Sequence, residues 1–302
     1  MTKQILFMLL TSILSTPALT AQEAAAVPIT YNVGTFGVTT LTDAQNQMNA
    51  GVLIGATDEM LSRYLKDGKA NGAINAFLVE TSDRTILVDA GLGNKLVDNL
   101  KTYGKTPDDI DVILLTHLHG DHIGGLLRDG KKVFTKAEVY VSQAEYNYWT
   151  NETILKGLPE NKRGGFARAV EAMKAYKDKL HFFVPTEAGK QLLPGISAVE
   201  AYGHTPGHTA FLLESDGSQL LIWGDVTHLT PIQIPCPQLA VTYDVDPTVA
   251  IASRKRILQF VASKKIRVAG MHIEYPGIGD IKGDADKGYS FSLTCKCEGT
   301  VK

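Results

Sequence analysis

The sequence predicts an α/β fold in which two mixed β-sheets stack and helices cover their outer faces. Two observations support this fold: short apolar runs with strand character recur along the chain, and helical patterns alternate with them after the first strands. The chain of 302 residues also contains no Ser/Gly-rich linker, low-complexity tract or internal period. We therefore expect residues 22–302 to form a single folded domain.

The individual elements follow from local signals. Early strands are expected at residues 31–40, 73–80 and 85–89, and a turn at residues 82–84 joins the last two. Ser142 and Glu145 have the spacing of a capping box, and Asp246 is a predicted N-cap followed by Pro247 at the first helical position. Helices are expected at residues 58–66, 94–103, 142–151, 166–177 and 246–263. Apolar runs predict further strands at residues 112–115, 139–141, 196–199, 211–214, 220–224 and 267–271.

A cluster of metal-binding side chains directly follows the run at residues 112–115, which has the character of a buried parallel strand. Residues 116–122 read Thr-His-Leu-His-Gly-Asp-His. Three imidazoles and a carboxylate of mixed type within six residues do not suit the specific geometry of one tetrahedral structural ion, so they are better explained as parts of two sites. His117 and His119 would face one ion from an extended segment, and Asp121 and His122 would face the other beyond a turn at Gly120.

Further candidate ligands end three later apolar runs. His204 lies in Gly-His-Thr-Pro-Gly-His after the run at residues 196–199, Asp225 ends the run at 220–224, and His272 ends the run at 267–271. Polar residues at the carboxyl ends of buried strands usually converge on one crevice in α/β folds. We therefore expect these three residues to join the cluster at 117–122.

This pattern, His-x-His-x-Asp-His followed by His, Asp and His, resembles the metallo-β-lactamase superfamily. The resemblance implies an αββα sandwich and two divalent ions, expected to be Zn²⁺. It assigns His117, His119 and His204 to the first ion and Asp121, His122 and His272 to the second. Asp225 would bridge both ions.

Three further residues take roles from the same resemblance. In the family, the ligand of the His-Thr-Pro-Gly-His segment lies about twenty residues before the bridging Asp, so His204 is the ligand and His208 lies behind it or in the core. Asp89 matches an early Asp that orients ligands from behind. Trp149 matches an aromatic residue of the substrate pocket, and its alternative role is that of a helix residue packed in the core.

The substrate-facing residues resemble two groups of this superfamily. Residues 204–209, 224–225 and 272–279 are most similar to methyl parathion hydrolase-like enzymes and then to N-acyl homoserine lactone lactonases, and the likeness runs from about residue 31 to 289. His228 departs from both, because the lactonases carry Tyr and methyl parathion hydrolase an apolar residue at this position. A donor there would suit a developing oxyanion, so we expect His228 to be catalytic. Its alternative is a histidine exposed in a loop.

The expected chemistry is metal-assisted hydrolysis. Two divalent ions can share a water, lower its pKa towards about 7 and supply a bridging hydroxide. Asp121 or Asp225 would accept or return a proton. Gly-x-Ser-x-Gly is absent, which disfavours a serine hydrolase.

We expect a lactone or carboxylic ester as substrate, then a phosphotriester, then a β-lactam. An iron sulfur dioxygenase-like enzyme and a non-catalytic zinc-binding protein are the alternatives of other classes. The second predicted site, Asp121, His122 and His272, disfavours the iron enzyme.

The amino terminus has the layout of a secretory signal. Lys3 precedes an apolar stretch at residues 5–14 and a small-residue segment at 15–21, too short to span a bilayer. We expect a periplasmic or secreted protein without a membrane anchor, and amino-terminal sequencing from the native compartment should begin near Gln22. An intact Met1 would contradict this prediction.

The net charge limits the kinds of partner that the protein is expected to bind. Loss of Lys3 with the signal takes the formal net charge from −2 to −3, which gives no electrostatic footprint for nucleic acid. A small-molecule substrate is the expected partner, and a homodimer is compatible with the sequence.

Three cysteines are too few for a disulfide framework. Cys236 could pair with Cys295 or Cys297, and a metal site at residues 295–297 is less favoured.

Overall fold

The structure is a computed structural model that describes residues 29–160, 163–294 and 300–301. The predicted signal peptide at residues 1–21 and the tail cysteines, Cys295 and Cys297, lie outside the described residues. Cys236 is buried in a small apolar cluster, and its pairing stays a prediction.

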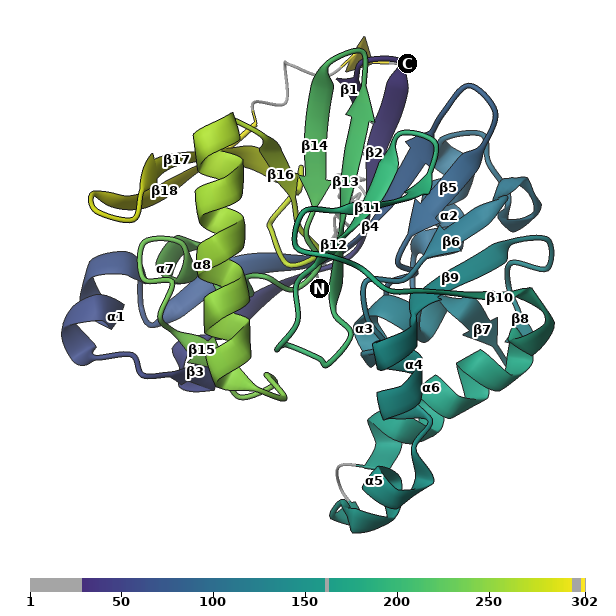
Figure 1. Cartoon of the computed structure of the whole chain (residues 1–302), viewed down its shortest axis with the longest axis horizontal. Helices are drawn as coiled ribbons and strands as arrows, with labels where there is room; N and C mark the ends of the chain where they lie inside the picture. The colour runs from purple at the N-terminus through teal and green to yellow at the C-terminus, as the bar shows by residue number, and fades with distance from the viewer. Residues whose placement is uncertain (1–28, 161–162, 295–299, 302) are drawn as a thin grey trace, which may run out of the picture.

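Two mixed β-sheets pack face to face (Figure 1). Neighbouring strands of the first sheet are, in order, β10 (Leu180–Phe183), β9 (Glu138–Ser142), β6 (Val112–Leu114), β5 (Thr85–Val88), β4 (Lys69–Glu80), β2 (Phe36–Asn49), β1 (Ile29–Val33) and β19 (Thr300–Val301). Those of the second sheet are β11 (Lys190–Leu193), β12 (Ile196–Glu200), β13 (Thr209–Ser215), β14 (Ser218–Ile222), β16 (Arg267–Ala269), β17 (Ile278–Asp284) and β18 (Gly288–Leu293). Short pairs join β3 (Leu53–Ile54) to β15 (Ala240–Val241) and β7 (Leu127–Arg128) to β8 (Lys131–Lys132).

Helices cover the outer faces of both sheets (Figure 1). The first sheet carries α2 (Leu96–Thr102), α4 (Gln143–Trp149) and α6 (Arg163–Ala175), and the second carries α8 (Pro247–Lys264). Successive side chains of a strand point to opposite faces. In β4, Phe77 and Val79 therefore enter the core between the sheets, whereas Ala76 and Leu78 enter the helix-covered core. The predicted two-sheet sandwich with outer helices is confirmed.

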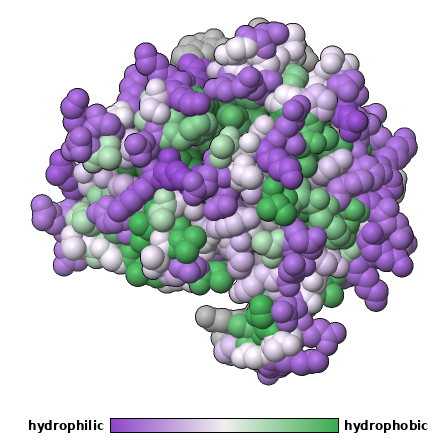
Figure 2. All heavy atoms as spheres, in the orientation of Figure 1, coloured by the Kyte–Doolittle hydropathy of each residue, from purple (hydrophilic) through white to green (hydrophobic). Residues whose placement is uncertain are grey.

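The remaining helices are short. They are α1 (Asp58–Tyr64), α3 (Gly120–Ile123), α5 (Glu152–Gly157) and α7 (Thr230–Gln233), with 3₁₀ turns η1 (Ala50–Val52), η2 (Pro107–Asp109), η3 (Gly124–Leu126) and η5 (Lys177–Lys179). α5 projects from the body of the sandwich in the ribbon and space-filling views (Figures 1 and 2). None of the helices in the described part of the chain combines the length and apolar character that a membrane crossing requires.

Local signals predicted most helices but misplaced some boundaries. Asp246 caps α8 as predicted, accepting hydrogen bonds from the amides of Thr248 and Val249 at 3.1 Å. The single strand predicted at residues 31–40 is wrong, because a turn at residues 34–35 folds it into the hairpin of β1 and β2. The capping box of Ser142 and Glu145 is half formed. The Ser142 hydroxyl accepts from the Glu145 amide, but the Glu145 carboxylate bonds elsewhere.

Candidate metal centre

The predicted ligands meet where several strands end. His117 and His119 lie in the extended segment after β6, and Asp121 and His122 lie in the first turn of α3. His204 lies in the loop from β12 to β13, whereas Asp225 and His272 follow β14 and β16. The ligand atoms of these residues gather in overlapping groups whose members lie within 4.8 Å of one another. The convergence expected from the apolar runs is therefore present.

The first group contains His117, His119, His204 and Asp225. His119 Nδ1 lies 2.9 Å from His117 Nε2 and 3.0 Å from His204 Nε2. His204 Nε2 lies 3.2 Å from Asp225 Oδ2. Three imidazoles and one carboxylate oxygen thus face one point, which is a ligand set typical of zinc.

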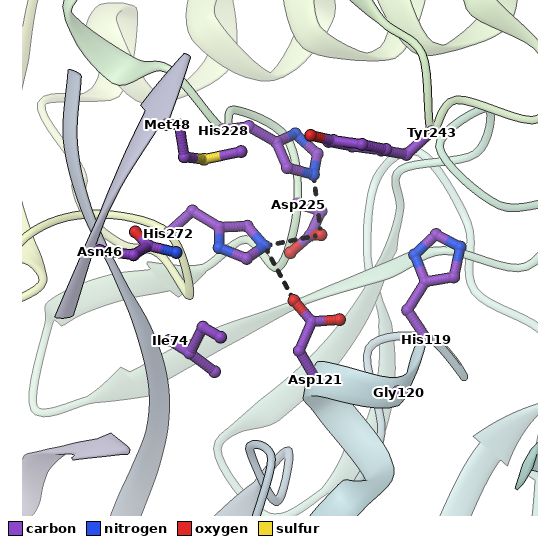
Figure 3. A pocket seen from close by; sticks show the side chains of 10 residues that line it. All are labelled: Asn46, Met48, Ile74, His119, Gly120, Asp121, Asp225, His228, Tyr243 and His272. Atoms are coloured by element: carbon purple, nitrogen blue, oxygen red, sulfur yellow. Dashed lines mark hydrogen bonds and ion pairs between the residues drawn. The ribbon is translucent and has the colours of Figure 1, made fainter. Parts of the chain in front are cut away.

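The second group contains Asp121, His122 and His272. Asp121 Oδ2 lies 3.8 Å from His122 Nε2 and 3.6 Å from His272 Nε2. Asp225 reaches this group too, with Oδ1 at 3.2 Å from His122 Nε2 and Oδ2 at 3.1 Å from His272 Nε2 (Figure 3). Asp225 therefore lies between the groups, as a bridging ligand must.

Hydrogen bonding in the groups fits bound divalent ions. Metal-ligating histidines commonly give their outer ring nitrogen to a carboxylate or carbonyl. Here His122 Nδ1 faces Asp89 Oδ2 at 2.6 Å, and His272 Nδ1 faces the carbonyl of Ala73 at 3.1 Å. Among the described residues, the inward atoms His122 Nε2 and Asp225 Oδ1 are buried and lie 3.2 Å apart, but neither makes a hydrogen bond. Buried polar atoms rarely lack partners, so these two atoms fit a site built to hold ions.

Asp89 lies directly behind His122, as the resemblance implied. Its carboxylate also accepts hydrogen bonds from the Thr116 amide at 2.8 Å and the Thr116 hydroxyl at 2.7 Å. Its φ of 59° is unusual for a residue with a side chain, and such backbone strain collects at functional sites. Burial raises the pKa of the Asp89 carboxyl, and the neighbouring His122 opposes that shift.

Asp244 is a contact of the site that the sequence did not indicate. Its Oδ1 faces His204 Nδ1 at 2.8 Å, and its Oδ2 accepts from the Val241 amide at 3.0 Å. Burial alone would raise the pKa of Asp244, but the hydrogen bond and charge of His204, the Val241 amide and the charge of Arg254 together outweigh burial and lower the pKa. Asp244 orients His204 much as Asp89 orients His122. In the sequence it looks like an ordinary acidic residue before the predicted helix.

His208 lies behind Asp225. Its Nδ1 donates to the carbonyl of Ala201 at 2.8 Å, and its Nε2 accepts from the Asp225 amide at 3.0 Å. Burial lowers the pKa of His208 to about 3, which keeps the ring neutral. Gly224 permits this contact, because its φ is 62° and an added Cβ would lie 2.3 Å from His208 Nε2. Among the described residues, neither ligand group includes His208.

Trp149, at the end of α4, contacts His119. Its indole packs edge-on against His119 with ring centroids 5.3 Å apart, and it also packs on Phe166. The side chain is buried in the helix-covered core, and it does not line the cavity beside the ligands. The structure therefore gives Trp149 the packing role named as its alternative.

A cavity of about 350 Å³ opens beside Asp225 (Figure 3). Its lining comes from β2 and β4, the α3 segment and the loops after β14, β15 and β16. The residues are Asn46, Met48, Ile74, His119, Gly120, Asp121, Asp225, His228, Tyr243 and His272. This volume suits a small organic ligand.

His228 lines this cavity and is only 3% exposed, so its alternative as an exposed loop residue is wrong. Its Nε2 lies 3.1 Å from Asp225 Oδ2, and its ring stacks on His272 with centroids 4.7 Å apart. Burial lowers the pKa of His228 to about 4, so the ring is neutral near pH 7. Within the described residues, Nδ1 has no hydrogen-bond partner.

Comparisons with known proteins match most of this chain. A family model described as the metallo-beta-lactamase superfamily matches residues 70–266. An uncharacterized Bacillus subtilis protein, YobT, is 28% identical over 158 residues, which cover 52% of this chain and 63% of that protein. The chain thus spans less than two thirds of that relative. An N-acyl homoserine lactonase from Bacillus thuringiensis is 24% identical over 219 residues, covering 63% of this chain and 76% of the lactonase.

Two solved structures are similar over most of their length. Hydrolase AbOPH, in the beta lactamase superfamily, has a TM-score of 0.82 at 29% identity and covers 90% of this chain and 99% of its own. AidC, a dizinc quorum-quenching lactonase in complex with the product N-hexanoyl-L-homoserine, has a TM-score of 0.80 at 29% identity. That match covers 89% of this chain and 97% of AidC.

Proposed function

The chain belongs to the metallo-beta-lactamase superfamily, and from that premise we propose that it is a binuclear zinc hydrolase that opens small lactones. The observation that carries the proposal is Asp225, which joins two ligand groups at the wall of a cavity of small-molecule size. The similarity to the dizinc lactonase AidC and to the Bacillus thuringiensis lactonase supports the same reaction class.

The protein's residues would hold the two ions, and the ions would activate water and substrate. Bound divalent ions would supply hydroxide at neutral pH and polarise the substrate carbonyl. His117, His119 and His204 would hold one ion, and Asp121, His122 and His272 the other, with Asp225 shared.

A carboxylate must also return a proton to the leaving alcohol. The Asp121 side chain is 30% exposed and faces the cavity, whereas that of Asp225 is 2% exposed. We therefore assign the proton transfer to the Asp121 carboxylate.

The cavity wall supports an acylated lactone as substrate. Met48 and Ile74 supply apolar surface for an acyl chain. Asn46 also lines the cavity, and its amide lies beside the His272 ring, with Met48 above and Ile74 below it in Figure 3. The amide offers both a donor and an acceptor to a substrate amide. N-acyl homoserine lactones combine these features. Phosphotriesters are the second candidate, because the same apolar wall would accommodate their ester groups.

Parallel assays test the reaction class. The zinc-loaded protein should hydrolyse N-hexanoyl homoserine lactone faster than methyl parathion, an aryl ester or nitrocefin, with kcat/KM as the measurement. The matched control is Asp225→Ala prepared in the same way, since residual activity in it would come from a contaminant. Methyl parathion turnover above lactone turnover would replace the lactone proposal with the phosphotriester one. No turnover on any substrate would favour a non-catalytic zinc-binding protein.

A further inference from the structure

We propose that Glu145 is a positioning residue of the metal centre. Its buried carboxylate clamps the segment that carries His117 and His119 to the loop that carries His204, and so sets the geometry of the first ion site. This inference rests on the metal binding within the proposed function and not on the identity of the substrate.

Each carboxylate oxygen of Glu145 accepts two hydrogen bonds. Oε1 accepts from the Leu118 amide at 3.0 Å and from Trp149 Nε1 at 2.5 Å. Oε2 accepts from the Thr205 hydroxyl at 2.7 Å and from the Gly207 amide at 2.9 Å. Leu118 stands between His117 and His119, and Thr205 directly follows His204. One side chain on α4 therefore bonds to both segments that supply imidazoles to the first ion.

Glu145 is fully buried, and these four partners are neutral donors. Burial raises the pKa of the Glu145 carboxyl, and the hydrogen bonds from Thr205, Leu118, Gly207 and Trp149 oppose that shift. A buried carboxylate is costly unless its oxygens are satisfied. Because four donors from three segments saturate it, movement of either ligand segment would leave a buried polar group without a partner.

The contact between α4 and the His204 loop is tight. The Ser142 hydroxyl, at the N-terminus of α4, donates to the carbonyl of Gly207 at 2.8 Å. An added Cβ at Gly207 would lie 2.2 Å from the Glu145 amide nitrogen, so only glycine permits this approach. Glu145 also holds Trp149, whose indole supports His119 from behind. Residues of α4 therefore contact both the segment that carries His119 and the loop that carries His204.

Glu145→Gln tests the clamp with almost no change of volume. The Leu118 amide and Trp149 Nε1 can only donate, so the single oxygen of Gln should stay on their side. The new amide nitrogen then faces Thr205, which can rotate to accept, and the Gly207 amide, which cannot. The variant should therefore loosen the His204 loop in particular.

Metal titration in two backgrounds isolates each site. His272→Ala removes the second site, and in this background Glu145→Gln should raise the zinc Kd of the remaining first site by about 10- to 100-fold, measured against a chromogenic chelator. His204→Ala removes the first site, and in that background the same change should alter the zinc Kd less than about threefold. An equal loss in both backgrounds, or no loss in the first, would overturn the clamp.

Glu138→Gln is the matched control. Glu138 lies on β9, which leads into α4, and bonds Lys179 Nζ and His181 Nε2 at 2.7 Å instead of ligand segments. Glu138→Gln should leave the zinc Kd unchanged in both the His272→Ala and the His204→Ala backgrounds.

Thr205→Val serves if Glu145→Gln fails to fold. It removes only the hydroxyl donor to Oε2 and should weaken the first site selectively, so unchanged zinc binding at that site would also refute the clamp. Absence of lactone turnover would refute only the proposed function, because the titration uses no substrate.

Discussion

Removing the divalent ions should abolish hydrolysis, and metal analysis of the protein should give close to two ions per chain. The seven candidate ligands form two groups joined by Asp225. In the proposed mechanism the bound ions would supply the hydroxide nucleophile at neutral pH, so their removal takes the nucleophile away. The measurement is elemental analysis and activity before chelation, after chelation and after zinc is restored. Activity should return only with the metal.

Single-ligand variants test the assignment of each site. His272→Ala should lower the metal content to about one ion per chain, and His204→Ala should lose the first ion. His208→Ala should keep both ions, because His208 contacts the Asp225 backbone and faces neither group. One ion per chain that is unchanged in His272→Ala would refute the binuclear assignment, and one iron per chain would favour the dioxygenase alternative. Loss of metal in His208→Ala but not in His204→Ala would show that the wrong histidine was chosen.

The ligands were predictable because each follows a recognisable strand. Asp225 and His272 directly follow apolar runs that form β14 and β16, and parallel strands bring their carboxyl ends to one edge. Asp89, which orients His122, also follows a strand, β5, but the other orienting residues, Asp244 and Glu145, carry no such signal. Asp244 lies 40 positions from His204, and Glu145 lies 27 positions from Leu118. In the sequence, an acidic residue near a helix start is equally well explained as a cap.

The residues of β2 that line the cavity could not be predicted from the sequence either. β2 continues to Asn49, well past the predicted end at residue 40, although residues 42–49 are largely polar. Pairing with β4 extends it, since Asn46 and Met48 are in register with Gly72 and Ala70. This extension carries Asn46 and Met48 to the cavity. Strand pairing overrode local propensity there, as is common for strands.

Replacing His228 with leucine should lower kcat on lactones by roughly tenfold to a thousandfold, the range typical of losing one oxyanion donor. His228 is buried at the cavity wall and lies 3.1 Å from the central carboxylate. A neutral imidazole has one N–H, and in the tautomer that carries it on the unpartnered Nδ1 the ring can donate to the carbonyl oxygen as negative charge develops. A phosphotriester needs apolar walls more than an added donor, so its hydrolysis should fall little or rise. Comparing kcat on N-hexanoyl homoserine lactone and methyl parathion for the same variant measures this difference.

Metal content separates this donor role from ligation by His228. Asp225, His228 and His272 also form a group of possible ligand atoms, so a ligand role would make His228→Leu lose metal together with activity on both substrates. If His228 donates to the substrate, the variant should keep both ions and lose activity mainly on the lactone. His228→Gln restores a side-chain donor and should recover part of the lactone rate, which a purely packing role would not produce. Wild-type rates on both substrates would remove His228 from the reaction altogether.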